Sequence, residues 1–102
     1  MSILHTVSRS TYQNGALLSC LRVAQTDCAV LLMEDGVYAA LSAGHSSALL
    51  VDAAQQIQFY ALEADLQARG ITGSEILERV QVVDYRGFVA LACEFDKVLA
   101  WF

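Results

Sequence analysis

Apolar positions along the chain follow two alternating patterns, and each pattern predicts a different kind of element. Short continuous apolar runs are typical of strands that are buried on both faces of a parallel sheet. Between these runs, apolar residues recur every three or four positions, which is typical of one face of a helix. Leu17, Cys20, Leu21 and Ala24 form such a face. The sequence therefore predicts strands and helices in alternation.

The predicted strands are short and the predicted helices lie between them. The strands are Ile3–Val7, 28–33, 57–62, Val80–Val83 and a last edge strand at 98–102. The helices are 12–24, 37–41, a segment capped by Ser46 or Ser47 that runs to Gln55, 63–69, and a segment capped by Asp84 that runs through Phe95. Gly70 suits the position that ends a helix, because glycine adopts the left-handed conformation required there.

This order favours one α/β domain over residues 1–102, with a doubly wound, mostly parallel sheet and helices on both faces in a flavodoxin-like, three-layer arrangement. Leu31, Leu32, Val82 and Val83 are predicted to be buried in central strands. Ligands of such folds bind at the carboxyl ends of the strands. Three loops are expected there: 8–10, 34–36 and the segment around Asp84.

The composition adds an apolar excess to this picture. Counted with Gly and without Tyr, apolar residues are 59 of the 102 residues, or 58%, whereas ordinary soluble domains contain about 45–50% by the same count. Two explanations stay open at this point. Other chains cover part of the surface, or the core of a small α/β domain is simply well filled.

Charge and segment lengths exclude several classes of protein. The net charge is −5, with eleven acidic and six basic residues and no basic cluster, so direct binding of nucleic acid is not expected. The longest clear apolar run, 28–33, is far shorter than the ~20 residues of a membrane-spanning helix. The N-terminus shows no signal-peptide pattern. Three cysteines without close spacing fit free thiols in a reducing cytoplasm.

Candidate chemistry is sparse. The chain has no nucleotide-binding glycine motif, and no cofactor is predicted. His5 and His45 stand alone without metal-ligand spacing, so no metal site is predicted, and His5 is expected to have a hydrogen-bonded structural role. Glu34 and Asp35, next to Gly36, are explained by a turn. No nucleophile-elbow motif supports a hydrolytic triad.

The three cysteines differ in their predicted surroundings. Cys28 and Cys93 are predicted to be small core residues among apolar neighbours. Cys20 lies in mid-helix, on or beside the apolar face, where the helix dipole does not lower the pKa of a thiol. From the residues alone, packing is the better explanation of Cys20 than chemistry.

Four segments in order resemble the DsrH/TusB family of the DsrE-like superfamily. They are Leu4-His5-Thr6 followed by Arg9-Ser10, then the run 31–40 (LLMEDGVYAA), the run 60–70 (YALEADLQARG) and the run 83–89 (VDYRGFV). Trp101 matches the terminal tryptophan of the family. The resemblance covers essentially the whole chain.

The resemblance implies a DsrE-like fold and a cytoplasmic heterohexamer with DsrE/TusD-like and DsrF/TusC-like subunits. One branch of the family resembles the DsrEFH complex of intracellular sulfur oxidation, and the other resembles the TusBCD complex, which relays persulfide sulfur toward 2-thiolation of the tRNA wobble uridine. TusA-like and DsrC/TusE-like proteins would be the sulfur carriers of these complexes. Cys20 falls at the position of a first-helix cysteine in DsrH-like members, and this match favours sulfur oxidation.

Three hypotheses follow for this chain. The first is a subunit of a DsrEFH-like sulfurtransferase complex with Cys20 as an auxiliary persulfide carrier, while the main catalytic cysteine belongs to a partner subunit. The second is a non-catalytic structural subunit of the same complex. The third, independent of the resemblance, is a small α/β domain that binds a ligand at the strand ends.

Overall fold

The structure of the protein is a computed structural model that describes residues 2–10, 15–43 and 47–102. Its strands are β1 (Ile3–Val7), β2 (Ala29–Leu32), β3 (Gln58–Leu62), β4 (Val80–Val83) and β5 (Lys97–Trp101). Its α-helices are α1 (Ala16–Val23), α2 (Ser47–Ala53), α3 (Glu63–Ala68) and α4 (Tyr85–Glu94). Two 3₁₀ helices, η1 (Glu34–Ala40) and η2 (Gly73–Glu75), complete the described elements.

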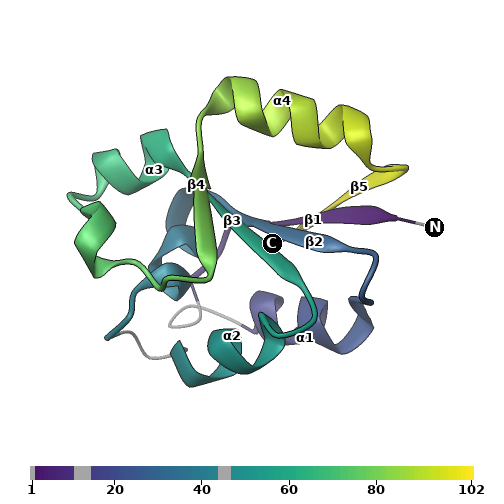
Figure 1. Cartoon of the computed structure of the whole chain (residues 1–102), viewed down its shortest axis with the longest axis horizontal. Helices are drawn as coiled ribbons and strands as arrows, with labels where there is room; N and C mark the ends of the chain where they lie inside the picture. The colour runs from purple at the N-terminus through teal and green to yellow at the C-terminus, as the bar shows by residue number, and fades with distance from the viewer. Residues whose placement is uncertain (1, 11–14, 44–46) are drawn as a thin grey trace.

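The five strands form one sheet in the order β4-β3-β2-β1-β5, and every neighbouring pair is parallel. The chain winds from β1 outward to β4, and α4 then carries it back across the sheet to β5, which pairs with β1 (Figure 1). The predicted parallel α/β fold and the predicted last edge strand are both confirmed.

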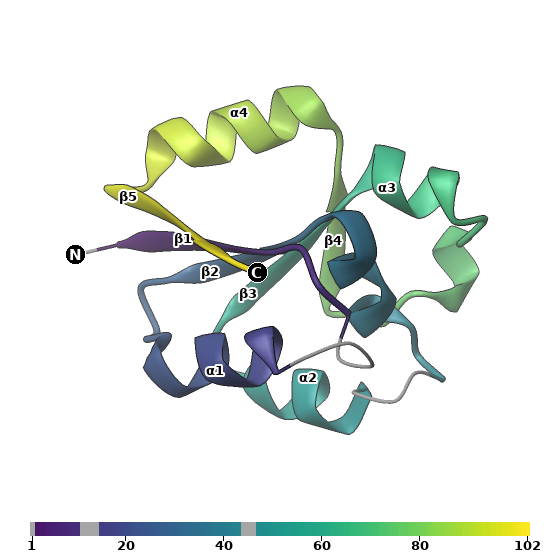
Figure 2. The same cartoon turned by 180° about the vertical axis from the view of Figure 1, so that it is seen from behind.

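Helices cover both faces of the sheet, but unequally. Helices α1 and α2 lie on one face and α4 lies on the other (Figure 2). The larger apolar cluster is on the α1 side and includes Val7, Val30 and Phe59, all fully buried. The smaller cluster joins Leu4 and Leu31 to side chains of α4. The sheet is therefore the middle of three layers, as predicted.

Two predicted helix boundaries are confirmed in atomic detail. Asp84 precedes α4 and its Oδ1 accepts a hydrogen bond from the Gly87 amide at 2.8 Å, which satisfies one of the free donors of the first turn. Gly70 follows α3 with φ +69°, the left-handed conformation that glycine adopts without steric cost.

The predicted burial of Val82 and Val83 is wrong, whereas Leu31 and Leu32 are fully buried as predicted. Val82 is 38% exposed and Val83 is only partly buried. The physical reason is the strand order, since β4 is an edge strand and a short apolar run looks the same in sequence at the edge and in the centre of a sheet.

Smaller differences concern helix bounds. The segment predicted as a helix over 37–41 is the 3₁₀ helix η1, which begins three residues earlier at Glu34. The predicted helix over 12–24 is described from Ala16 onward. Tyr12, His45 and Ser46 lie outside the described residues.

Candidate functional site

An open cavity of ≈ 680 Å³ lies at the carboxyl ends of the strands, where parallel α/β folds bind ligands. We call it the strand-end crevice, and it is lined by Ser8, Arg9, Glu34, Asp35, Asp65, Arg69 and Phe102. Two of the three predicted loops, those after β1 and β2, therefore meet at the crevice. The third, around Asp84, does not contribute to its lining, and Asp84 acts as a helix cap.

Charged side chains in the crevice hold one another in place. The Nε and Nη2 atoms of Arg69 both donate to Oδ1 of Asp35, at 3.0 and 2.8 Å. Arg69 Nη1 donates to the Asp65 carbonyl oxygen at 3.1 Å, and Asp65 Oδ2 accepts from the Glu34 amide at 2.7 Å. The network ties η1 to α3, and Asp35 is thus an ion-pair partner as well as a residue of the turn.

The backbone after β2 turns in very little space. A Cβ atom at Gly36 would lie 2.0 Å from the Val7 carbonyl oxygen, so only glycine fits this approach to β1. Glu34 has φ +49°, an unusual conformation for a residue with a side chain. The bond from the Asp65 carboxylate to the Glu34 amide supports this turn.

Asp65 and Arg69 were not predicted as site residues. The usable signal was their spacing, because an acidic and a basic residue four positions apart lie on the same face of a helix. That pattern is common on exposed helices, and it does not show that the pair reaches toward a loop after a different strand.

The cysteines lie away from the crevice. Cys20 is fully buried in α1, and burial, with a smaller contribution from nearby Cys28, raises the pKa of its thiol to about 12. Cys28 is also buried, as predicted. The predicted burial of Cys93 is wrong, because its position on α4 turns away from the sheet and the residue is exposed.

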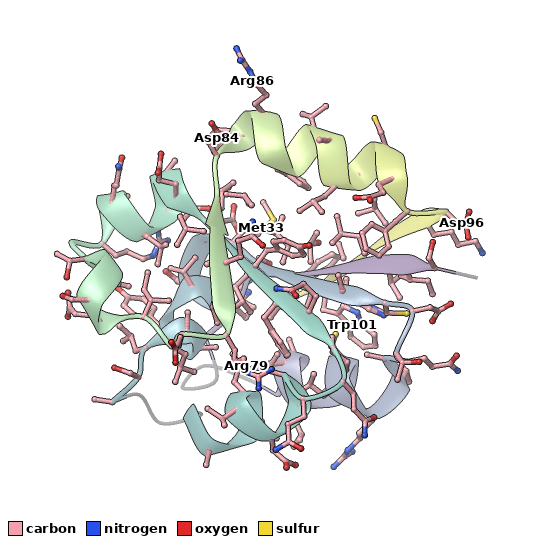
Figure 3. The ribbon with its side chains drawn as sticks, in the orientation of Figure 1. Met33, Arg79, Asp84, Arg86, Asp96 and Trp101 are labelled. Carbon is pink, nitrogen blue, oxygen red and sulfur yellow. The ribbon has the colours of Figure 1, made fainter. Side chains whose placement is uncertain are left out.

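His5 has the hydrogen-bonded structural role that the sequence predicts. Trp101 Nε1 donates to His5 Nδ1 at 3.0 Å, which joins β1 to the end of β5. His5 is 1% exposed, and burial lowers its pKa. Trp101 lies on the α1 side of the sheet (Figure 3).

Two further properties bear on the kind of site. Within residues 2–10, 15–43 and 47–102, no group of three or more His, Cys, Asp or Glu side chains could hold a metal ion. Over the same residues, no helix is long and apolar enough to cross a lipid bilayer.

The fold and the crevice together define a class of protein. The chain has a three-layer α/β fold, and the described residues that line its strand-end crevice are polar apart from Phe102 and include no cysteine or histidine. Of the two buried thiols, Cys20 is held in the protonated form, which is a poor nucleophile. Such a domain can present surfaces and charged groups to a partner.

Solved structures share this fold. The ychN protein from E. coli matches with a TM-score of 0.79 and 22% identity, over 98% of this chain and 99% of that chain. A protein of unknown function, MTH1491 from Methanobacterium thermoautotrophicum, matches with a TM-score of 0.72 and 20% identity, over 96% of each chain. At these identities the likeness establishes the architecture alone.

Sequence relatives establish the family. Residues 9–98 match the family described as DsrH like protein. The chain is 39% identical over 99 residues to Protein TusB of Pectobacterium atrosepticum and 35% identical to Protein TusB of Yersinia pestis; each match covers 97% of this chain and all of the relative. The chain therefore belongs to the DsrH-like family, and the resemblance noted in its sequence is confirmed.

Proposed function

We propose that this chain is a TusB-like subunit of a cytoplasmic sulfur-relay complex that serves 2-thiolation of the tRNA wobble uridine. The observation that carries the proposal is the similarity to proteins named TusB over nearly the full length of both chains. This naming favours the tRNA branch over the sulfur-oxidation branch, to which the position of Cys20 had pointed.

The proposed partners are TusD-like and TusC-like subunits in a heterohexamer, with TusA-like and TusE-like carriers delivering and accepting sulfur. The net charge of −5 supports an indirect relation to tRNA, because a subunit without a basic cluster gives phosphates few partners. Exposed apolar residues on α4 and β5, among them Tyr85, Val89 and Val98, are consistent with surfaces that other chains cover.

Within this complex we assign the chain a structural role. A persulfide relay needs an accessible thiolate, and Cys20, the cysteine at the family position, is fully buried with its pKa raised to about 12. Cys93 is exposed, but it lies on α4 and does not line the strand-end crevice. A role of Cys20 as auxiliary carrier stays a prediction. It is favoured by the family position of the residue, and it requires that a partner open α1 or supply a cation beside the thiol.

The proposal is tested in a bacterial strain that lacks its own TusB. The chain is expressed there together with the TusC-like and TusD-like proteins of its own organism, and 2-thiouridine in total tRNA is measured by nucleoside mass spectrometry. We expect 2-thiouridine to return, and to depend on all three proteins. An assembled complex that leaves 2-thiouridine at the level of the deletion strain would contradict the proposal.

A further inference from the structure

Strand β5 is tied to β1 by side chains at both of its ends. At its start, Asp96 Oδ2 accepts from the Ser2 amide at 3.0 Å and the Asp96 amide donates to Ser2 Oγ at 3.1 Å. At its end, Trp101 donates to His5 at 3.0 Å, and the Ser8 amide donates to the Trp101 carbonyl oxygen at 3.3 Å. The last residue of the chain, Phe102, lines the strand-end crevice.

The bond between His5 and Trp101 fixes where the imidazole holds its proton. An indole N–H can only donate, so His5 Nδ1 must be the unprotonated acceptor and Nε2 carries the hydrogen of the neutral ring. That Nε2 atom is buried and has no hydrogen-bond partner among the described residues. A second proton could enter only at Nδ1, where it would displace the Trp101 bond.

The surroundings of His5 offer no compensation for a positive charge. Its neighbours in register are Val30 on β2 and Leu99 on β5, and these residues point to the same face of the sheet. From α1, the inward titratable group is the Cys20 thiol, which is neutral because burial raises its pKa. On β5, Lys97 shares this face with Leu99 and Trp101, but it is exposed and pairs with Ile3 rather than His5. Burial is the cause of the shift in the His5 pKa. Asp96 is held by Ser2 at the opposite end of β5 from Trp101.

We propose that His5 is a proton-operated latch that holds the C-terminal end of β5, and with it the Phe102 wall of the strand-end crevice, against β1. In the neutral state Nδ1 accepts the Trp101 hydrogen bond and the latch is closed. Uptake of one proton from solvent at Nδ1 breaks this bond, and Trp101 and Phe102 separate from β1 while the Ser2–Asp96 contact keeps the start of β5 in place. This inference goes beyond the proposed function and does not depend on it.

The direction of the pH effect follows from the shift of the His5 pKa. Burial lowers the folded-state pKa below the ordinary value of 6.5. The unfolded chain therefore takes up the proton first, and the contribution of the closed latch to stability is complete above about pH 6.5. It declines as the pH falls below that value and levels off once the pH is below the folded-state pKa.

Trp101 is the only tryptophan of the sequence, so its fluorescence reports on the latch directly. His45 is the only other histidine, so its substitution is the control. Tryptophan emission of the full-length protein is recorded between pH 8 and pH 5 for the wild type, His5→Gln and His45→Gln. We expect a shift to longer wavelength with a midpoint below pH 6.5 in the wild type and in His45→Gln, and no such transition in His5→Gln, whose amide can accept the bond but does not titrate.

Ring nitrogen NMR of the wild type gives a second readout that needs no variant. The His5 ring should be the Nε2–H tautomer at pH 8 and should titrate at the midpoint of the emission shift, with far-UV circular dichroism unchanged over the same range. An emission transition that persists in His5→Gln, an Nδ1–H tautomer, or loss of secondary structure at the same pH would overturn the latch.

Discussion

Cys20 and Cys93 show how burial alone assigns different chemistry to residues of one type. Cys20 is enclosed between α1 and the sheet and its pKa is about 12, so roughly one thiol in 10⁵ is ionised at pH 7. Cys93 is exposed on α4. The position of a cysteine in a helix pattern therefore says less about its reactivity than the layer that covers it.

Alkylation rates test this contrast directly. In the folded protein at pH 7.5 we expect Cys93 to react with iodoacetamide first, and Cys20 to stay unmodified until the protein unfolds, because the reagent needs a thiolate within reach. Peptide mass spectrometry after timed quenching follows each site. Modification of Cys20 at a rate similar to Cys93 under native conditions would show that α1 opens readily.

The free energy of unfolding should respond differently to substitution of Cys20 and of Cys93. Cys20→Ser places a hydroxyl among apolar neighbours and should lower the free energy of unfolding by about 1–3 kcal/mol, as judged from protein mutational data on buried polar groups. Cys93→Ser should change it by less than about 0.5 kcal/mol, as is usual at exposed sites. Urea unfolding monitored by circular dichroism measures both. Equal effects of the two variants would contradict the burial difference.

At the scale of elements, the contact of η1 with β1 and α3 organises the strand-end crevice. Gly36 admits the Val7 carbonyl oxygen where no side chain would fit, and the Arg69 network holds η1 to α3. These two features place the loops after β1 and β2 side by side.

Gly36→Ala should therefore disrupt the fold locally and strongly. The added Cβ would lie 2.0 Å from the Val7 carbonyl oxygen, and relief of this overlap should lower the free energy of unfolding by about 1–3 kcal/mol. Gly73→Ala is the matched control, since nothing lies within 4 Å of its Cβ position. Thermal unfolding of the two variants should differ by many degrees, and equal melting temperatures would contradict the close approach.

Arg69→Met tests the ionic part of the same contact. Removal of the guanidinium leaves Asp35 and Asp65 close together without their cation. We expect the free energy of unfolding to fall by about 1–2 kcal/mol, and this decrease to become smaller as salt is added. Arg86 projects away from the sheet from α4 (Figure 3). Arg86→Met is thus the control and should hardly change the free energy of unfolding. A decrease as large as that of Arg69→Met would show that the Arg69 network does not cause the effect.

The position of each strand and helix along the chain was easier to predict than which elements lie next to one another in space. Apolar runs located every strand, and residue type located the helix ends at Asp84 and Gly70, because these signals are local. The strand order is not local, and it decides that Val82 is at an edge while Leu31 is central. The crevice was predicted from two of its loops, whereas Asp65 and Arg69 required knowledge of where α3 packs.

At the scale of the whole molecule, the two faces of the sheet are covered unequally. Helices α1 and α2 cover one face, while α4 is the helix that covers the other and carries exposed Tyr85 and Val89 on its own surface. The proposed place in a sulfur-relay complex gives this apolar surface a context, because a subunit of a complex leaves such surfaces for other chains.

Co-expression tests assembly. We expect the chain to elute with its TusC-like and TusD-like proteins as one species of higher mass, and Val89→Asp, which places a charge on the exposed apolar surface of α4, to weaken that association without unfolding the chain. Size-exclusion chromatography with light scattering gives the mass. A wild-type chain that stays monomeric in the presence of both proteins would contradict the proposed partnership.

The measurement that tests the central claim most directly locates sulfur in the assembled complex. The complex is loaded with a persulfide donor, and each cysteine is read by alkylation and mass spectrometry in the wild type and in Cys20→Ala. A structural TusB-like subunit predicts persulfide on a partner subunit, none on Cys20, and unchanged transfer to the TusE-like acceptor in Cys20→Ala. Persulfide on Cys20, together with slowed transfer in Cys20→Ala, would contradict the structural role and make this subunit a carrier.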